Sequence, residues 1–170
     1  MTTSDSPAQT IVRPATTADL PRIGFLGALL VEEHYDFDNL RFLAPRNRTP
    51  ADYGAFMLPQ LQSPDVVVLV ADDNGDVIGY SYAAVEGYDY MSLRGPAGVV
   101  HDVIVDPEYR GRGVGRLLLE ATLKRLASRG VPRVVLTTAE QNDPAQRFFA
   151  SVGFRRTMIE MTLELDGNAP

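Results

Sequence analysis

A run of arginine and glycine near the middle of the chain has the residue types needed to hold an anion. The run is Arg110, Gly111, Arg112, Gly113, Val114, Gly115 and Arg116. Glycine lets the backbone approach a ligand closely, and arginine donates paired hydrogen bonds to phosphate oxygens. A helix predicted to begin at Gly113 would point its first amide hydrogens into the same loop. We therefore predict a ligand that carries phosphate, and a glycine-rich turn without a ligand is the alternative.

The spacing of the glycines separates the known kinds of phosphate loop. A nucleoside-triphosphate loop ends in Gly-Lys-Ser or Gly-Lys-Thr, whereas leucines follow Arg116 here. A dinucleotide loop has its third glycine where this chain has Arg116. The pattern that is met is Arg-x-x-Gly-x-Gly, from Arg110, Gly113 and Gly115. With this motif the chain resembles the GNAT superfamily of acetyl-CoA-dependent N-acetyltransferases, in which the motif binds the pyrophosphate of CoA.

A second motif of that superfamily follows later in the chain. Its matching residues are Asn142, Ala145, Phe148, Phe149, Gly153 and Phe154. The resemblance implies that Asn142 and Phe149 lie along the CoA arm. The alternative for Asn142 is a helix cap, with or without contact to the arm, and the alternative for Phe149, which the apolar helix face favours, is a place in the core. Many members have a tyrosine at the position of Phe149, near the CoA sulfur, where it can protonate the leaving thiolate. A thiol has a reference pKa of about 8.5, so we expect the phenylalanine to slow the step without abolishing it, with water or Tyr109 as the proton source.

Transfer of an acetyl group to an amine requires a base, because an alkyl amine is almost wholly protonated near neutral pH. His101 precedes Val103, Ile104 and Val105, whose backbone the resemblance implies for binding the CoA arm. Strand alternation predicts that His101 shares a face with Val103 and Val105, and we assign it as the general base. A histidine hydrogen-bonded in the core is the alternative.

Asp102 is predicted on the opposite face of the same strand, unless a bulge changes the register. It is a second catalytic candidate that would hold the amine or orient a neighbour, and a structural hydrogen bond is the alternative. A backbone amide between residues 103 and 105 would polarise the acetyl carbonyl.

We expect the acceptor pocket to be formed by the loop segments outside the two motifs, residues 34–56 and 86–95. Acidic and aromatic side chains there suit a cationic amine, although acidic loops are often only solvated. The substrate candidates are Tyr35, Asp36, Glu86 and Tyr88.

Periodicity and turn residues predict the elements that position these groups. The predicted strands are residues 10–13, 66–71, 77–85, 99–105, 133–138 and 156–165, and the predicted helices begin near residues 18, 49, 113 and 142. The order βααβββαβαβ is that of an α/β fold, and the resemblance implies a mixed, mostly antiparallel central sheet flanked by helices. We expect one N-acetyltransferase domain over residues 10–166, preceded by a flexible N-terminus at residues 1–9.

Composition limits the other function classes. The 170 residues are 45% hydrophobic and 22% charged, with no long apolar run, which is typical of a globular protein outside the membrane. The absence of cysteine excludes disulfides, thiolate metal sites and an acyl-cysteine intermediate. The net charge of −6 argues against a nucleic-acid partner, and we expect no metal and a cytoplasmic location.

The sequence thus predicts an N-acetyltransferase that moves an acetyl group from acetyl-CoA to a primary amine of a small molecule, by direct attack in a ternary complex. The alternatives are a protein N-terminal or lysine acetyltransferase, and a non-catalytic acyl-CoA-binding regulator. The oligomeric state is left open, with a homodimer among the alternatives.

Overall fold

The computed structural model describes residues 10–165. Residues 1–9, for which we predict a flexible N-terminus, lie outside the described residues, as do residues 166–170. The elements are β1 (Ile11–Pro14), the 3₁₀ turn η1 (Thr17–Asp19), α1 (Leu20–Phe37), α2 (Thr49–Gln62), β2 (Val66–Asp73), β3 (Asp76–Glu86), β4 (Ala97–Val105), the 3₁₀ turn η2 (Pro107–Tyr109), α3 (Val114–Ala127), β5 (Val134–Leu136) and α4 (Asp143–Val152).

The five strands form one sheet in the order β1-β2-β3-β4-β5. Each pair of neighbours is antiparallel except β4 and β5, which are parallel because α3 crosses over between them. The predicted α/β class, with a mixed and mostly antiparallel sheet, is confirmed. The tight turn between β2 and β3 forms at Asn74 and Gly75, both with positive φ.

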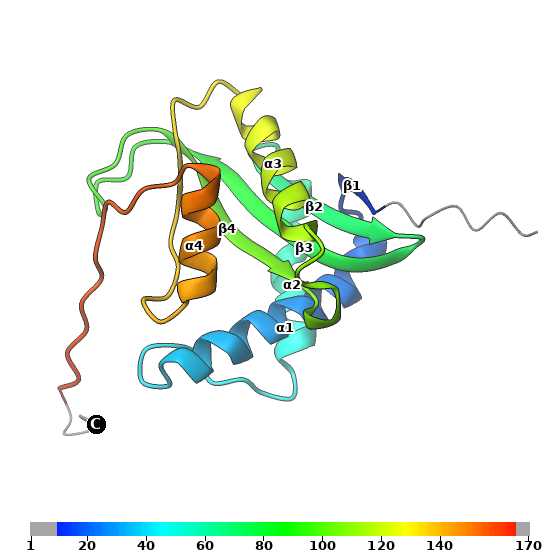
Figure 1. Cartoon of the computed structure of the whole chain (residues 1–170), viewed down its shortest axis with the longest axis horizontal. Helices are drawn as coiled ribbons and strands as arrows, with labels where there is room; N and C mark the ends of the chain where they lie inside the picture. The colour runs from blue at the N-terminus through cyan, green and yellow to red at the C-terminus, as the bar shows by residue number, and fades with distance from the viewer. Residues whose placement is uncertain (1–9, 166–170) are drawn as a thin grey trace, which may run out of the picture.

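Helices cover both faces of the sheet (Figure 1). On one face α1 and α2 bury an apolar cluster that includes Ile23, Met57 and Tyr80. On the other face α3 buries Leu118 and Leu126 against the strands. The alternation of apolar residues along β2 and β3 supplies both clusters, because successive side chains point to opposite faces. No helix within residues 10–165 combines the length and the apolar character that crossing a bilayer requires.

The prediction of a final strand at residues 156–165 is wrong, because no strand is assigned after α4 in the part of the chain described. Its apolar residues do alternate as in a strand, but a strand also needs a neighbouring edge to bond to, and the segment lies against none. The element order therefore ends with α4, as βααβββαβα (Figure 1).

Candidate functional site

The glycine loop connects the end of β4 to the start of α3, as the sequence predicts. Gly111 and Gly113 have φ angles of +75° and +83°, which side chains other than glycine rarely adopt. No atom lies within 4 Å of the place where a Cβ would sit on either residue, so the backbone is open to a ligand. Gly113 is the N-cap of α3, and no side chain caps it. The amide hydrogens of the first turn of α3 are therefore available to an anion.

The three arginines of the loop also fasten it to its surroundings. Arg110 donates from Nε to the carbonyl oxygen of Val105 at 2.9 Å, and its guanidinium pairs with Glu33. Arg112 lies over the ring of Tyr109, and Arg116 donates to the hydroxyl of Ser151 on α4 at 2.9 Å. Each guanidinium carries five N–H groups, so these contacts leave donors that can reach a phosphate.

The edge of β4 next to the loop has no strand partner within residues 10–165. β5 pairs only with residues 98–100, whereas β4 continues to Val105. The amide of Asp106 donates to the carbonyl of Ile78 on β3, so by alternation the backbone groups of Val103 and Val105 point away from β3. There the carbonyl of Val105 accepts from Arg110, and the amides of Val103 and Val105 face the side that β5 does not cover. This is the geometry that backbone binding of an extended ligand arm requires.

The second motif meets the first where α4 approaches the start of α3. A Cβ placed on Gly115 would lie 3.9 Å from the ring of Phe148, and Ser151 on the same helix holds Arg116. Asn142 caps α4, accepting from the amide of Ala145 at 3.1 Å. The tertiary structure thus brings together two stretches that are separated in the sequence.

Phe149, which stands where many GNAT proteins have tyrosine, is half-buried between two other aromatic rings. Its ring centroid is 5.3 Å from that of Phe148 and 6.0 Å from that of Phe154. The ring packs on the apolar cluster under α3, so its place in the core is sufficient to explain an apolar residue.

His101 occupies a β-bulge, and this overturns the face predicted for it. Ala83 pairs with Val100 and Tyr82 pairs with Asp102, so His101 is an extra residue in β4. The expectation that His101 shares a face with Val103 and Val105 is therefore wrong. Its ring stacks on that of Tyr82, on the face that α1 and α2 cover, with centroids 4.8 Å apart and planes at 27°.

The bulge brings His101 to Glu86, which is 15 residues away in the sequence. Nε2 of His101 lies 3.1 Å from Oε1 of Glu86, and Arg94 donates to the other carboxylate oxygen at 2.7 Å. A carboxylate only accepts, so the Nε2–H donates to it, and a neutral ring then carries its lone pair on Nδ1. This is an oriented imidazole with one nitrogen free to take a proton.

Asp102 lies on the face opposite Val103, as predicted, and is held by two tyrosines. The hydroxyl of Tyr80 donates to its carboxylate at 2.9 Å, and the hydroxyl of Tyr53 on α2 donates to the same oxygen. Burial raises the pKa of Asp102 above its ordinary value, although the two hydrogen bonds favour the charged form. Burial beside this carboxylate also raises the pKa of Tyr53, so its phenol stays protonated and keeps donating. The contacts show a carboxylate that ties α2 to the sheet.

Tyr80 and Tyr82 were not among the predicted site residues. A signal for them was present, because residues two apart in a strand share a face, and Tyr80, Tyr82 and Glu86 all follow that period. The sequence of β3 alone does not show which residues of β4 lie beside these side chains.

The structure places the four substrate candidates in three different settings. Glu86 contacts His101. Tyr35 and Asp36 line a hollow of about 480 Å³ at the end of α1, together with Thr162 and Glu164. Tyr88 is 75% exposed in the loop between β3 and β4. Of the four, Glu86 is the one joined to the histidine.

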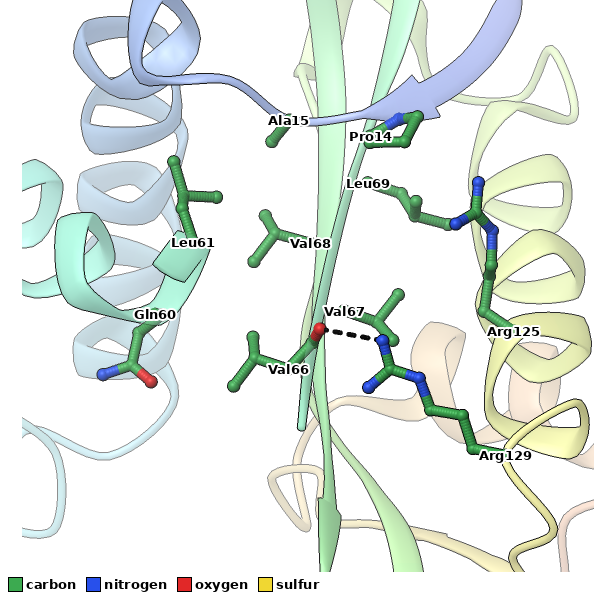
Figure 2. A pocket seen from close by; sticks show the side chains of 10 residues that line it. All are labelled: Pro14, Ala15, Gln60, Leu61, Val66, Val67, Val68, Leu69, Arg125 and Arg129. Atoms are coloured by element: carbon green, nitrogen blue, oxygen red, sulfur yellow. Dashed lines mark hydrogen bonds between the residues drawn. The ribbon is translucent and has the colours of Figure 1, made fainter. Parts of the chain in front are cut away.

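A smaller hollow, of about 130 Å³, lies at the far end of α3 (Figure 2). Arg129, which lines it, donates to the carbonyl of Val66 at 3.3 Å, and Gln60 of α2 lies on the other side of the strand in Figure 2. Arg125, which also lines it, is about 16 Å along the helix from Val114 at a rise of about 1.5 Å per residue. This hollow is therefore separate from the glycine loop.

Comparison with known proteins identifies the family to which the chain is similar. The model of the Acetyltransferase (GNAT) family matches residues 30–154. Mycothiol acetyltransferase from Thermobispora bispora is 40% identical over 96 residues, which are 54% of this chain and 31% of that protein. Mycothiol acetyltransferase from Thermobifida fusca is 30% identical over 165 residues, which are 89% of this chain and 50% of that protein. The chain thus spans no more than half the length of these relatives.

Solved structures share the same fold. Aminoglycoside N-acetyltransferase AAC(6')-Iy, in complex with CoA, superposes with a TM-score of 0.73 at 17% identity, covering 96% of this chain and 99% of that one.

Proposed function

The chain belongs to the GNAT family of acetyltransferases, and from that premise we propose that it moves an acetyl group from acetyl-CoA to a primary amine of a small molecule. One observation carries the proposal: an open glycine loop caps α3 directly beside a β4 edge that β5 leaves free. The loop amides and the arginines suit a pyrophosphate, and the free amides of β4 suit the amide-containing arm that follows it in CoA.

The reaction joins the amine nitrogen to the acetyl carbon and breaks the bond between that carbon and sulfur. His101 takes a proton from the amine through Nδ1, while Glu86 holds the ring by its Nε2–H. A β4 amide at Val103 or Val105 stabilises the oxyanion that develops on the carbonyl. The sulfur leaves as thiolate and takes up a proton from water, because the chain has phenylalanine at position 149.

A small, cationic acceptor is favoured by what surrounds His101. Glu86 and Asp89 place carboxylates next to the histidine and Arg94, and the chain as a whole carries a charge of −6. A cationic amine is attracted to such a surface before it loses its proton. The relatives named above are called mycothiol acetyltransferases, and that name refers to a small molecule rather than to a protein.

An assay of CoA release tests the proposed reaction. The purified chain is incubated with acetyl-CoA and a panel of amines, and the CoA thiol is measured with a thiol reagent, which the cysteine-free chain does not consume. Release with a small amine, but not with peptides that present a lysine or a free N-terminus, supports the proposal. Release with the peptides alone would assign the chain to protein acetylation. Tight binding of acetyl-CoA without release in any mixture would favour a non-catalytic regulator, a reading that Phe149 makes worth testing.

A pair of glycine variants tests the loop. Alanine at Gly113 forces a side chain into the left-handed region, at a strain of about 1–2 kcal/mol, and should weaken acetyl-CoA binding roughly tenfold or more. Gly75 in the β2–β3 turn is the matched control, because it also has a positive φ and open space around its Cβ. Gly75→Ala should lose similar stability but keep the affinity for acetyl-CoA, measured by calorimetry. Equal affinity for acetyl-CoA in both variants would show that the ligand does not bind at the glycine loop.

A further inference from the structure

Arg110, the first residue of the Arg-x-x-Gly-x-Gly motif, is bound to a carboxylate of a distant helix. Its guanidinium pairs with Glu33 on α1, which is 77 residues away in the sequence and passes beside the turn between β4 and α3 (Figure 1). The other two loop arginines differ in this respect. Arg112 donates to a backbone carbonyl oxygen at 3.1 Å, and Arg116 pairs with Glu120 of its own helix at 3.6 Å. Within residues 10–165, Arg110 is thus the loop arginine whose acidic partner comes from another part of the fold.

The ion pair uses the nitrogen of Arg110 that a phosphate also needs. Nε donates to the carbonyl oxygen of Val105 at 2.9 Å, and Nη2 donates to the carboxylate of Glu33. A guanidinium holds a phosphate in two parallel hydrogen bonds through either of two edges, Nε with Nη2 or Nη1 with Nη2. Because Nη2 belongs to both edges, a phosphate on either edge lies next to the carboxylate of Glu33.

Glu33 and a phosphate cannot both lie against Arg110 without repelling each other. The side chains of Glu33 and Arg110 are 35% and 44% exposed, so water and salt screen their charges only in part. An ion pair of this exposure contributes little to stability, whereas a phosphate accepts strong charge-assisted hydrogen bonds from a guanidinium. A phosphate can therefore replace Glu33, but its binding is weakened by the contact that it must break.

We propose that Glu33 and a phosphate of acetyl-CoA compete for Arg110, and that this competition limits how tightly the chain holds acetyl-CoA and CoA. The inference rests on the proposed binding of acetyl-CoA at the glycine loop. CoA must leave before another acetyl-CoA can bind, and product release limits the turnover of many enzymes. A carboxylate that weakens the hold of Arg110 on the phosphate therefore favours release of the product.

Calorimetry of acetyl-CoA binding tests the competition. Glu33→Gln keeps the shape of the side chain and removes its charge, so the affinity should rise about threefold to tenfold. Glu32→Gln is the matched control, because Glu32 is the preceding residue of α1, is exposed and forms no ion pair within residues 10–165. It removes the same charge from the chain, and its affinity should stay within about twofold of the native value, because water and salt screen a charge at this distance from the loop.

Variants of Arg110 show whether the gain in affinity passes through its guanidinium. Arg110→Gln should bind acetyl-CoA more weakly than the native chain does. Adding Glu33→Gln to Arg110→Gln should bring no gain, because the cation for which the two anions compete is gone. Arg110→Lys keeps a cation with which Glu33 can pair, so adding Glu33→Gln to it should still raise the affinity.

Dephospho-CoA, which lacks the phosphate on the ribose, identifies the competing group. A gain in Glu33→Gln that remains with this ligand assigns the pyrophosphate as the competitor, and a gain that disappears assigns the ribose phosphate.

Three results would overturn the competition. If the native chain binds acetyl-CoA but Glu33→Gln binds it no more tightly than Glu32→Gln does, the competition is absent and the proposed function stands. If the gain persists in the Arg110→Gln background, Glu33 acts through another cation. If the native chain does not bind acetyl-CoA at all, the proposed function fails together with this inference.

Discussion

Replacement of His101 by glutamine tests the catalytic assignment most directly. Glutamine keeps a donor that can reach Glu86 but has no basic lone pair, so it removes the base and leaves the local contacts near their native form. His101 hydrogen-bonds to Glu86 and stacks on Tyr82, and neither residue belongs to the glycine loop, so the affinity for acetyl-CoA should not change.

The size of the effect follows from the exposure of the site. A positioned base contributes roughly 10²–10⁴-fold to a rate, or about 2.7–5.5 kcal/mol at about 1.36 kcal/mol for each factor of ten. The His101 side chain is 36% exposed, so water can take over part of the proton transfer. We therefore expect kcat to fall by about 10²–10³-fold, in the lower part of that range.

Glu86→Gln should cost less, about tenfold, because the ring of His101 stays stacked on Tyr82 after its carboxylate partner is lost. If Glu86 acts by orienting His101, the double variant should be no slower than His101→Gln alone. Release of CoA is followed for all of these variants at the same pH, so that their kcat values can be compared directly. His34→Gln is the control, because His34 is the second of the two histidines and bonds to the carbonyl of Leu30 on its own helix.

Two results would refute the reasoning. If His101→Gln kept its kcat within about threefold, far short of what a positioned base contributes, the proton would go elsewhere. If the losses in His101→Gln and Glu86→Gln multiplied in the double variant, the two residues would act separately and the hydrogen bond between them would have no catalytic role.

Three further predictions concern stability and the leaving group. The hydrogen bonds of Arg13 hold the pKa of Asp19 below its ordinary 3.8, so the stabilisation from this pair is present above pH 3.8 and is lost as the pH falls further. The free energy of unfolding, measured with urea, should therefore change less between pH 7 and pH 3 in Asp19→Asn than in the native chain. An equal change in the two proteins would contradict the prediction. Thr122→Val should cost about 1–3 kcal/mol of unfolding free energy, because the fully buried Ser81 hydroxyl loses its partner, and adding Ser81→Ala should cost little more; additive losses would contradict this. Phe149→Tyr should raise kcat a few-fold if its ring lies near the CoA sulfur, whereas a loss of stability with unchanged kcat would confine position 149 to the core.

The sequence alone determined the features that depend on neighbouring residues. The glycine loop stands at a strand-to-helix junction because an arginine-glycine run there precedes an amphipathic helix, and Asn142 caps α4 because a side-chain amide can reach an amide three residues on. The hairpin of β2 and β3 follows from Asn74-Gly75, which adopts the tight turn locally. Each of these features depends on residues that are close together in the sequence, so the sequence alone is sufficient to predict them.

The tertiary structure decided what depends on a partner strand. The bulge at His101 is a property of the β3–β4 ladder, because only pairing shows that Val100 and Asp102 face adjacent residues of β3. That one extra residue turns His101 away from Val103 and toward Glu86, and it explains why alternation gave the wrong face. Residues 156–165 show the same dependence. Their sequence has the period of a strand, but strand pairing needs an edge, and no edge within residues 10–165 receives them.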